Sequence, residues 1–205
     1  MQPTRTLLSI GALAVLGAIV TPSLAAQSAQ RFSIQASGLF VGTYGEAYEG
    51  MNGGQGLEAQ LRYTPSVWSF GLGFQRSSHS FDDTGLGGED VVLSGVFFEP
   101  RRVMDVGSTA YAPYLSARLA VLRESVDIEY QGQPYSAEAS GTQLNLGGGV
   151  LLRVSPRVNV DLGATVGLIN FGDVELTVPG VGTANIGEGG TGQNVVMRAG
   201  LAIGL

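Results

Sequence analysis

The chain has 205 residues, no cysteine and a formal charge of −6. Charged residues make up 14% of it, against about a quarter in ordinary soluble domains, and all eleven basic residues are arginine. The lack of cysteine excludes disulfide and thiolate chemistry. The acidic balance, without arginine clusters interleaved with aromatics, argues against nucleic acid as a partner. So few charges also indicate that much of the surface faces something other than water.

The first 25 residues have the pattern of an export signal. Arg5 precedes an uncharged, mainly apolar run from Leu7 to Val20, and Thr21-Pro22 ends that run. Ser23-Leu24-Ala25 follows with small residues at its first and third positions, as signal peptidase requires. The run is too short for a spanning helix. We therefore predict a signal peptide over 1–25 and a single domain over 26–205, with an N-terminal membrane anchor as the alternative.

Alternation of apolar and polar residues is the main signal in the rest of the chain. In Leu57–Tyr63 the odd positions are apolar and the even ones polar, which is typical of a strand with two unlike faces. Trp68, Phe70, Leu72 and Phe74 continue the pattern after the short Thr64–Val67 turn, so the two segments form a hairpin. The pattern predicts eight strands, at 31–44, 54–64, 67–78, 90–99, 109–123, 141–154, 158–171 and 193–205.

The connections between these strands alternate in length. Short or middling ones fall at Thr64–Val67, Glu99–Ser108 and Ser155–Arg157, and long polar ones at 45–53, 79–89, 124–140 and 172–192. Most acidic residues lie in or beside the long connections, whereas Arg101, Arg102 and Arg157 lie at the short turns. Outer-membrane barrels have short periplasmic turns and long outer loops. This layout predicts periplasmic N- and C-termini and acidic extracellular loops.

Alternation alone does not say which face is inside, and a soluble lipocalin-like barrel alternates as well. The polar face here is mainly Gly, Ser, Gln and Asn, which suits a crowded lumen better than a watery exterior. Aromatics near strand ends predict two interfacial girdles, made of Tyr63, Trp68, Tyr111, Phe40, Phe74 and Phe171. The chain also stops on an amphipathic strand that ends at Leu205. These features favour an all-β fold, an eight-stranded antiparallel up-and-down transmembrane β-barrel.

These features together resemble the small outer-membrane β-barrel proteins of the outer-membrane protein A and X type. The resemblance rests on the signal peptide, the eight-strand rhythm, proline-marked turns such as Arg62-Tyr63-Thr64-Pro65, and the C-terminal strand. Such barrels usually end in Phe or Trp, which the assembly machinery recognises, whereas this chain ends in Leu205. The resemblance implies a place in the Gram-negative cell envelope, with lipid bilayer, lipopolysaccharide and the outer-membrane assembly machinery as partners.

Six charged residues on the polar face are expected to point into the lumen. An eight-stranded barrel is just wide enough for side chains to fill, so these residues predict a buried ion-pair network, made of Glu58, Arg62, Arg118, Arg153, Asp161 and Arg198. A plugged barrel of this kind has a structural or surface-interaction role, with a possible extracellular partner. A narrow porin-like channel for small solutes is the alternative.

Candidate chemistry elsewhere is sparse, and the chain predicts no enzyme, cofactor or metal. His79 is the only histidine, and a lipid-modifying enzyme built on it is a third, weaker hypothesis. Ser77 could share a face with His79, but no carboxylate or oxyanion donor is identifiable. We expect a solvated loop histidine. The acidic segment 81–90 offers oxygen ligands for Ca²⁺ but lacks EF-hand spacing, so it predicts a solvated loop.

Overall fold

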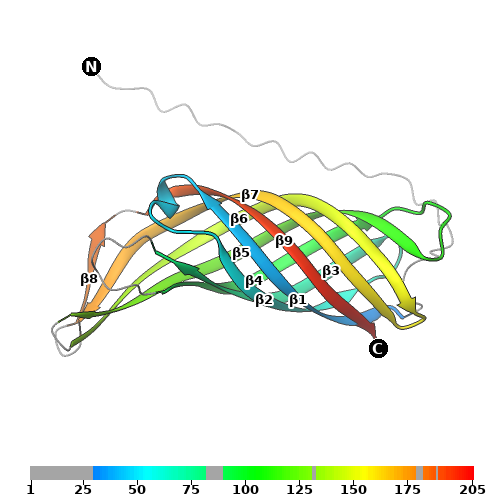
Figure 1. Ribbon diagram of the computed structural model, residues 1–205, viewed down its shortest axis with the longest axis horizontal. Helices are drawn as coiled ribbons and strands as arrows, with labels where there is room; N and C mark the ends of the chain where they lie inside the picture. Colours follow the sequence, from blue (N-terminus) through cyan, green and yellow to red (C-terminus); the bar gives the residue numbers. More distant parts are fainter. Residues whose placement is uncertain (1–29, 82–89, 131–132, 179–181, 188) are drawn as a thin grey trace, which may run out of the picture.

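The computed structural model describes residues 30–81, 90–130, 133–178, 182–187 and 189–205. Within these ranges the chain forms a closed antiparallel barrel of eight long strands, with a short ninth strand beside it (Figure 1). The predicted fold class is confirmed, while the predicted signal peptide lies outside the described residues. The barrel strands are β1 (Phe32–Tyr44), β2 (Gly54–Tyr63), β3 (Trp68–Ser80), β4 (Asp90–Val103), β5 (Tyr111–Tyr130), β6 (Gln133–Ser155), β7 (Val158–Val178) and β9 (Thr191–Gly204).

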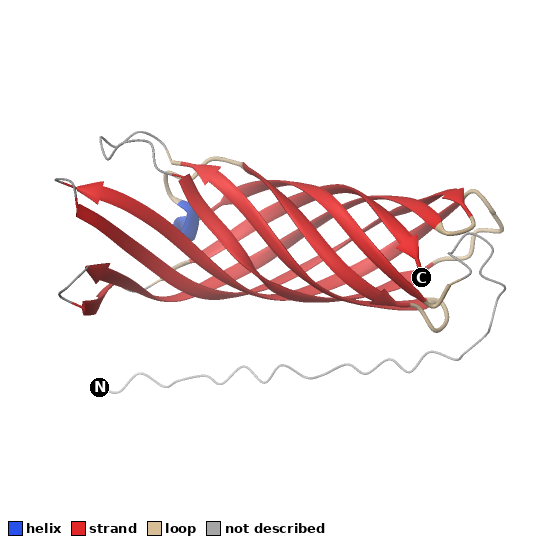
Figure 2. Ribbon diagram, turned by 90° about the horizontal axis from the view of Figure 1, so that it is seen from below, coloured by secondary structure: helices blue, strands red, loops and turns tan. Residues whose placement is uncertain are grey.

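Pairing between chain neighbours builds the ring, and β1 pairs with β9 to close it. β7 pairs directly with β9 from Val158↔Ile203 to Asn170↔Thr191. The short strand β8 (Gly182–Gly187) therefore stays outside the ring, paired only with β7. β1 begins and β9 ends at the same end of the barrel, together with the short turns; we call this the short-turn end. The 3₁₀ helix η1 (Glu46–Tyr48) lies at the opposite, long-connection end (Figure 2).

Two segments predicted as long polar loops are largely strand. Residues 124–140 form the ends of β5 and β6, which pair from Tyr111↔Leu152 to Tyr130↔Gln133. Residues 172–192 hold the end of β7, all of β8 and the start of β9. The prediction was wrong because the polar residues of these segments were read as loop, although inward residues such as Val126 and Val174 still pack on the apolar interior. Strands β5 to β8 consequently project beyond the rest of the barrel at the long-connection end (Figure 1).

The outward face of the barrel carries a continuous apolar band. On β3 it runs from Trp68 to Phe74, and Arg76 is the next outward residue beyond it. On β5 it runs from Tyr111 to Val121, followed outward by Arg123. Leu57 is 71% and Leu72 66% exposed, values that would be unfavourable in water for side chains of this size. The apolar residues of the alternating pattern therefore face out.

The aromatic residues predicted for the two girdles divide into outward and inward sets. Tyr63, Trp68 and Tyr111 are exposed at the short-turn end of the band, and Phe40 and Phe74 are exposed toward its other end. Phe171 is a correction, because it lies inside the barrel and is only 5% exposed. Its ring packs edge-on against Tyr48 of η1, with centroids 6.1 Å apart. Because Phe171 points inward from β7, its ring contacts Tyr48 and does not face lipid.

Candidate functional site

The barrel interior is filled by charged and polar side chains in its middle. Of the six lumen residues predicted from the sequence, five are buried on the inward face: Glu58 and Arg62 of β2, Arg118 of β5, Asp161 of β7 and Arg198 of β9. Arg153 of β6 also faces inward but is only half-buried, at the short-turn end. Four strands that are far apart in the sequence thus bring these five ionisable groups into one part of the lumen.

A glutamate of β4 is the centre of this cluster. The fully buried Glu99 carboxylate accepts hydrogen bonds from Arg118 Nη2 at 2.5 Å and from Arg101 Nε at 2.5 Å. Arg198 approaches with two nitrogens, Nη1 to Oε2 at 2.7 Å and Nη2 to Oε1 at 2.8 Å. This two-pronged contact is the strongest geometry for a guanidinium and a carboxylate. Glu99 therefore holds together arginines from three different strands.

Two further carboxylates complete the charge pairing. Arg101 Nη1 lies 2.9 Å from Asp161 Oδ2, and Arg118 Nη1 lies 2.7 Å from Glu58 Oε2. Asp161 also accepts hydrogen bonds at 2.6 Å from the Tyr114 hydroxyl and from Gln35 Nε2. The guanidinium groups of Arg101 and Arg118 lie over the rings of Tyr114 and Phe97, 4.4 and 3.9 Å from the centroids. Each charged group thus meets an opposite charge or an aromatic face.

The middle of the lumen carries four buried guanidinium groups and three buried carboxylates: Arg62, Arg101, Arg118 and Arg198 with Glu58, Glu99 and Asp161. Removing several charges from water costs several kcal/mol per ion in proteins, so such a cluster is stable only when its members pair closely. The short contacts above meet that requirement. Because the side chains reach across the barrel to touch each other, they occupy the path that a solute would take.

Glycines on the facing strands make room for one large side chain. A Cβ atom at Gly149 of β6 would collide with the Leu162 carbonyl oxygen and the Tyr114 hydroxyl, and one at Gly163 of β7 would lie 2.5 Å from that hydroxyl. The run Gly147-Gly148-Gly149, which is no phosphate loop, lies inside β6, and its last residue leaves room for the Tyr114 side chain. Small residues at these positions let the tyrosine cross the lumen and reach Asp161.

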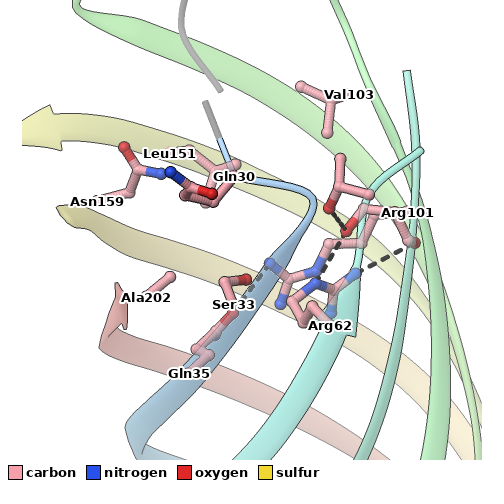
Figure 3. Close-up of a pocket in the computed structure, with 11 residues that line it drawn as sticks. Gln30, Ser33, Gln35, Arg62, Arg101, Val103, Leu151, Asn159 and Ala202 are labelled. Atoms are coloured by element: carbon pink, nitrogen blue, oxygen red, sulfur yellow. Dashed lines mark hydrogen bonds between the residues drawn. The ribbon is translucent and has the colours of Figure 1, made fainter. Parts of the chain in front are cut away.

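A small space remains at the short-turn end of the lumen. It has a volume of about 30 Å³ and lies beside Gln35, Arg62 and Arg101 (Figure 3). A cavity needs roughly 10–15 Å³ to hold one water molecule. Figure 3 shows the two arginine side chains side by side at its edge, with Ser33 and Gln35 facing them from β1. This space suits one or two waters rather than a solute.

In the long-connection half of the lumen, the side formed by β4 to β7 is apolar, which the alternating pattern did not predict. Residues from β4, β5, β6 and β7 pack there with Tyr48 and Met51: Val91, Leu93, Phe97, Ala120, Leu122, Ala139, Ile169 and Phe171. The segment with η1 folds over this layer, and Gly45 makes the bend with a φ of 98° that favours glycine. Burial raises the pKa of Tyr48 to about 12, so this hydroxyl stays neutral. An apolar layer thus covers the charged layer from the long-connection side.

His79 is buried in this upper part of the barrel, so the prediction of a solvated loop histidine was wrong. It is 1% exposed on the inward face of β3, where Nε2 lies 3.0 Å from Ser77 Oγ and Nδ1 lies 3.1 Å from the Asn52 carbonyl oxygen. Burial lowers the pKa of His79, which favours the neutral ring. Ser77 and His79 do share a face, but that face is turned away from the lipid side. The described residues hold no group of three potential metal ligands, and segment 82–89 lies outside them.

Several solved structures of small outer-membrane proteins are similar to this barrel. No protein-family model and no curated protein matches the chain. Neisserial surface protein A superposes with a TM-score of 0.57 at 20% identity, over 85% of this chain and 97% of that one. OprG of Pseudomonas aeruginosa gives 0.56 at 11% identity, over 88% and 98% of the two chains. Ail of Yersinia pestis gives 0.51 at 15% identity, over 85% and 99%. The chain has the fold of the small outer-membrane β-barrel proteins.

In this fold the apolar band is the surface that meets lipid, and the strands cross the bilayer where the band is apolar. On β5 the crossing segment ends at Val121, so Glu124 and the projecting part of the strand lie beyond it. Among the described residues no helix is long and apolar enough to cross a membrane.

Four interior residues that matter most were missed by the sequence analysis: Glu99, Arg101, Tyr114 and Gln35. The predicted strand 90–99 ended at Glu99, and Arg101 fell in the predicted connection Glu99–Ser108, so neither side chain was placed in the lumen. Alternation continues through Pro100 and could have placed both there: Phe97, Glu99, Arg101 and Val103 lie at every second position, and all four face inward. Pro100 interrupts the pairing of β4 with β5 only locally. The ladder runs up to Phe98↔Leu119 and resumes in the same register at Arg101↔Ser116, so the strand continues past the proline.

Proposed function

We propose that this chain is an outer-membrane barrel with a plugged lumen, whose role outside the cell is to contact an external partner through its projecting strands. The observation that carries the proposal is the Glu99-centred ion-pair network, which fills the lumen where a channel would run. With transport disfavoured, the part of the molecule left to act is the sheet of β5 to β8 beyond the apolar band. Ail, named the attachment invasion locus protein, shows that a surface role is compatible with this fold.

The charge distribution supports the orientation that the proposal needs. Acidic residues of the described chain gather at the long-connection end, among them Glu46, Asp127, Glu138, Asp173 and Glu175, while Arg31, Arg102 and Arg157 lie at the short-turn end. We infer that the long-connection end is extracellular, that both termini are periplasmic, and that residues 1–25 direct export. Lipopolysaccharide and phospholipid are then the neighbours of the outward band, and the assembly machinery inserts the chain.

The other two functions have weaker support. A channel would need the layer of Glu99 and its arginines to open, which would leave several buried charges without partners. A lipid-directed enzyme would need an accessible nucleophile and base, whereas His79 and Ser77 face the packed interior. We therefore propose no catalytic role.

Shortening the projecting hairpin tests the proposed role. Residues 126–137 would be replaced by a tight turn so that β5 and β6 end just beyond the band, and binding of the cells to surfaces or host cells would be measured. Retained heat-modifiable gel mobility serves as the folding control. The proposal expects a folded barrel with lost attachment. Attachment equal to that of the wild type, in a correctly folded variant, would contradict it.

A further inference from the structure

A cavity of about 220 Å³ opens among the projecting strands, outside the lipid-facing band. It lies between η1, β5, β6 and β7 and is separate from the charged middle of the lumen. Its walls are mostly apolar, with Val126, Ala137, Phe171 and Val174 among the lining residues. Pockets for drug-sized ligands measure about 300–1,000 Å³, so this cavity suits a smaller molecule.

One carboxylate faces this cavity without a cation to neutralise it. Glu124 follows the inward residues Ala120 and Leu122 of β5 in the alternating pattern and lines the cavity. Arg123, its neighbour in sequence, points to the outer face and pairs there with Glu138. Within the described ranges no basic side chain forms an ion pair with Glu124. Burial alone raises the pKa of Glu124 to about 7, as expected for a carboxylate in apolar surroundings.

The charge and shape of the cavity define what it can hold. Glu46 also lines it and would repel an anion, whereas Glu138 is already paired with Arg123. Ca²⁺ takes six to eight oxygen ligands, and the described residues present no group of three side chains that could hold a metal. An ammonium group on an apolar body fits both features, because the body covers the apolar walls while the cation pairs with the carboxylate.

We propose that this cavity binds a small amphipathic amine, with its apolar body against Phe171 and Val174 and its ammonium group on the Glu124 carboxylate. The site does not depend on the proposed surface role, since a plugged barrel without any partner would still hold it. Binding would occur at the outer mouth of the barrel, and the apolar layer around Phe97 and Ile169 separates it from the charged network.

Titration calorimetry on the barrel in lipid nanodiscs tests this site. The probe is 2-phenylethylamine, compared with the uncharged 2-phenylethanol and with the anion phenylacetate, and empty nanodiscs correct for partition into lipid. We expect saturable binding of one amine per barrel, about tenfold or more tighter than the alcohol, because the hydroxyl donates only a neutral hydrogen bond to the carboxylate whereas the ammonium group adds the opposite charge. Absence of saturable amine binding, or equally tight binding of phenylacetate, would overturn the proposal.

Two variants assign the binding to this cavity. Glu124→Gln keeps the side-chain shape and is expected to weaken amine binding about tenfold or more while leaving the weak binding of the alcohol unchanged. The control Glu175→Gln removes an exposed carboxylate of β7 and should leave binding unchanged. Ala137→Leu reduces the volume of the cavity and should weaken binding of both the amine and the alcohol. This variant tests the site independently if Glu124→Gln does not fold. Unchanged amine affinity in either cavity variant would contradict the site.

The pH dependence adds a readout that a purely structural role of Glu124 would not give. Amine affinity should increase from about pH 6 to about pH 8, since Glu124 ionises with a pKa of about 7 while the amine stays charged. Tyr48 and Glu46 of η1 and Glu138 of β6 are the other titratable groups near the cavity. The Tyr48 hydroxyl stays neutral throughout this range. Affinity independent of pH in the wild type would contradict pairing with Glu124.

Discussion

Replacing Glu99 by glutamine probes the charged centre of the barrel most sharply. The amide keeps the shape of the side chain but removes the charge that Arg101, Arg118 and Arg198 share at 2.5–2.8 Å. The buried cluster then has four guanidinium groups against two carboxylates, and the new NH₂ group faces donors. Breaking a buried ion pair by removing one partner costs about 3–5 kcal/mol, which is a large part of the roughly 5–15 kcal/mol that stabilises a typical domain.

Urea unfolding in lipid vesicles measures this loss. The fluorescence of Trp68, the only tryptophan, reports the transition, and Glu175→Gln serves as the control for losing an exposed carboxylate. The double variant Glu99→Gln with Arg198→Met should be less unstable than the sum of its single variants, because removing one arginine restores part of the balance. A change of less than about 0.5 kcal/mol for Glu99→Gln would refute the account of the network.

Three other predictions follow from the packing. Gly149→Ala would bring a Cβ atom against the Leu162 carbonyl oxygen and the Tyr114 hydroxyl, and should lower the free energy of unfolding by about 1–3 kcal/mol. Gly38→Ala, whose Cβ would lie 3.9 Å from its nearest atom, should change it by less than about 0.5 kcal/mol in the same urea titration. Ile169→Ala, at 1% exposure, should cost about 2–5 kcal/mol, and a smaller loss would mean that the apolar layer is loosely packed. Because the folded-state pKa of Glu124 is about 7, above its value of 4.5 in an unfolded chain, wild-type stability should fall as pH rises from about 4.5 to about 7, and Glu124→Gln should lack that component when unfolding midpoints are compared across pH.

The fold could be predicted from the sequence because alternation and connection length act locally. In Leu57–Tyr63 every second side chain is apolar, and a strand must place those side chains on one face. The low charge then indicated that this face meets lipid. The same local pattern placed Glu58, Arg62, Arg118, Asp161 and Arg198 on the inward face, where the structure has them.

The interior could not be predicted in detail because its contacts join residues far apart in the chain. Glu99 and Arg198 are 99 positions apart, and only the closed ring with its stagger brings them to one level. The apolar layer at the long-connection end could not be predicted from alternation either. In Val91-Val92-Leu93 both faces of β4 are apolar, so alternation is lost where the lumen itself is apolar. Phe171 and His79 were misplaced because each is buried by the segment that follows β1: Phe171 packs against Tyr48 of η1, and His79 contacts the Asn52 carbonyl oxygen.

Conductance in planar lipid bilayers tests the central claim that this outer-membrane barrel is a filled cylinder. The purified wild-type barrel would be inserted, with heat-modifiable gel mobility as proof of folding and an open porin as the positive control. The account predicts folded barrels that give no stable conductance steps, because the Glu99 cluster and the apolar layer above it fill the lumen. Reproducible steps of uniform size from the wild-type barrel would contradict it.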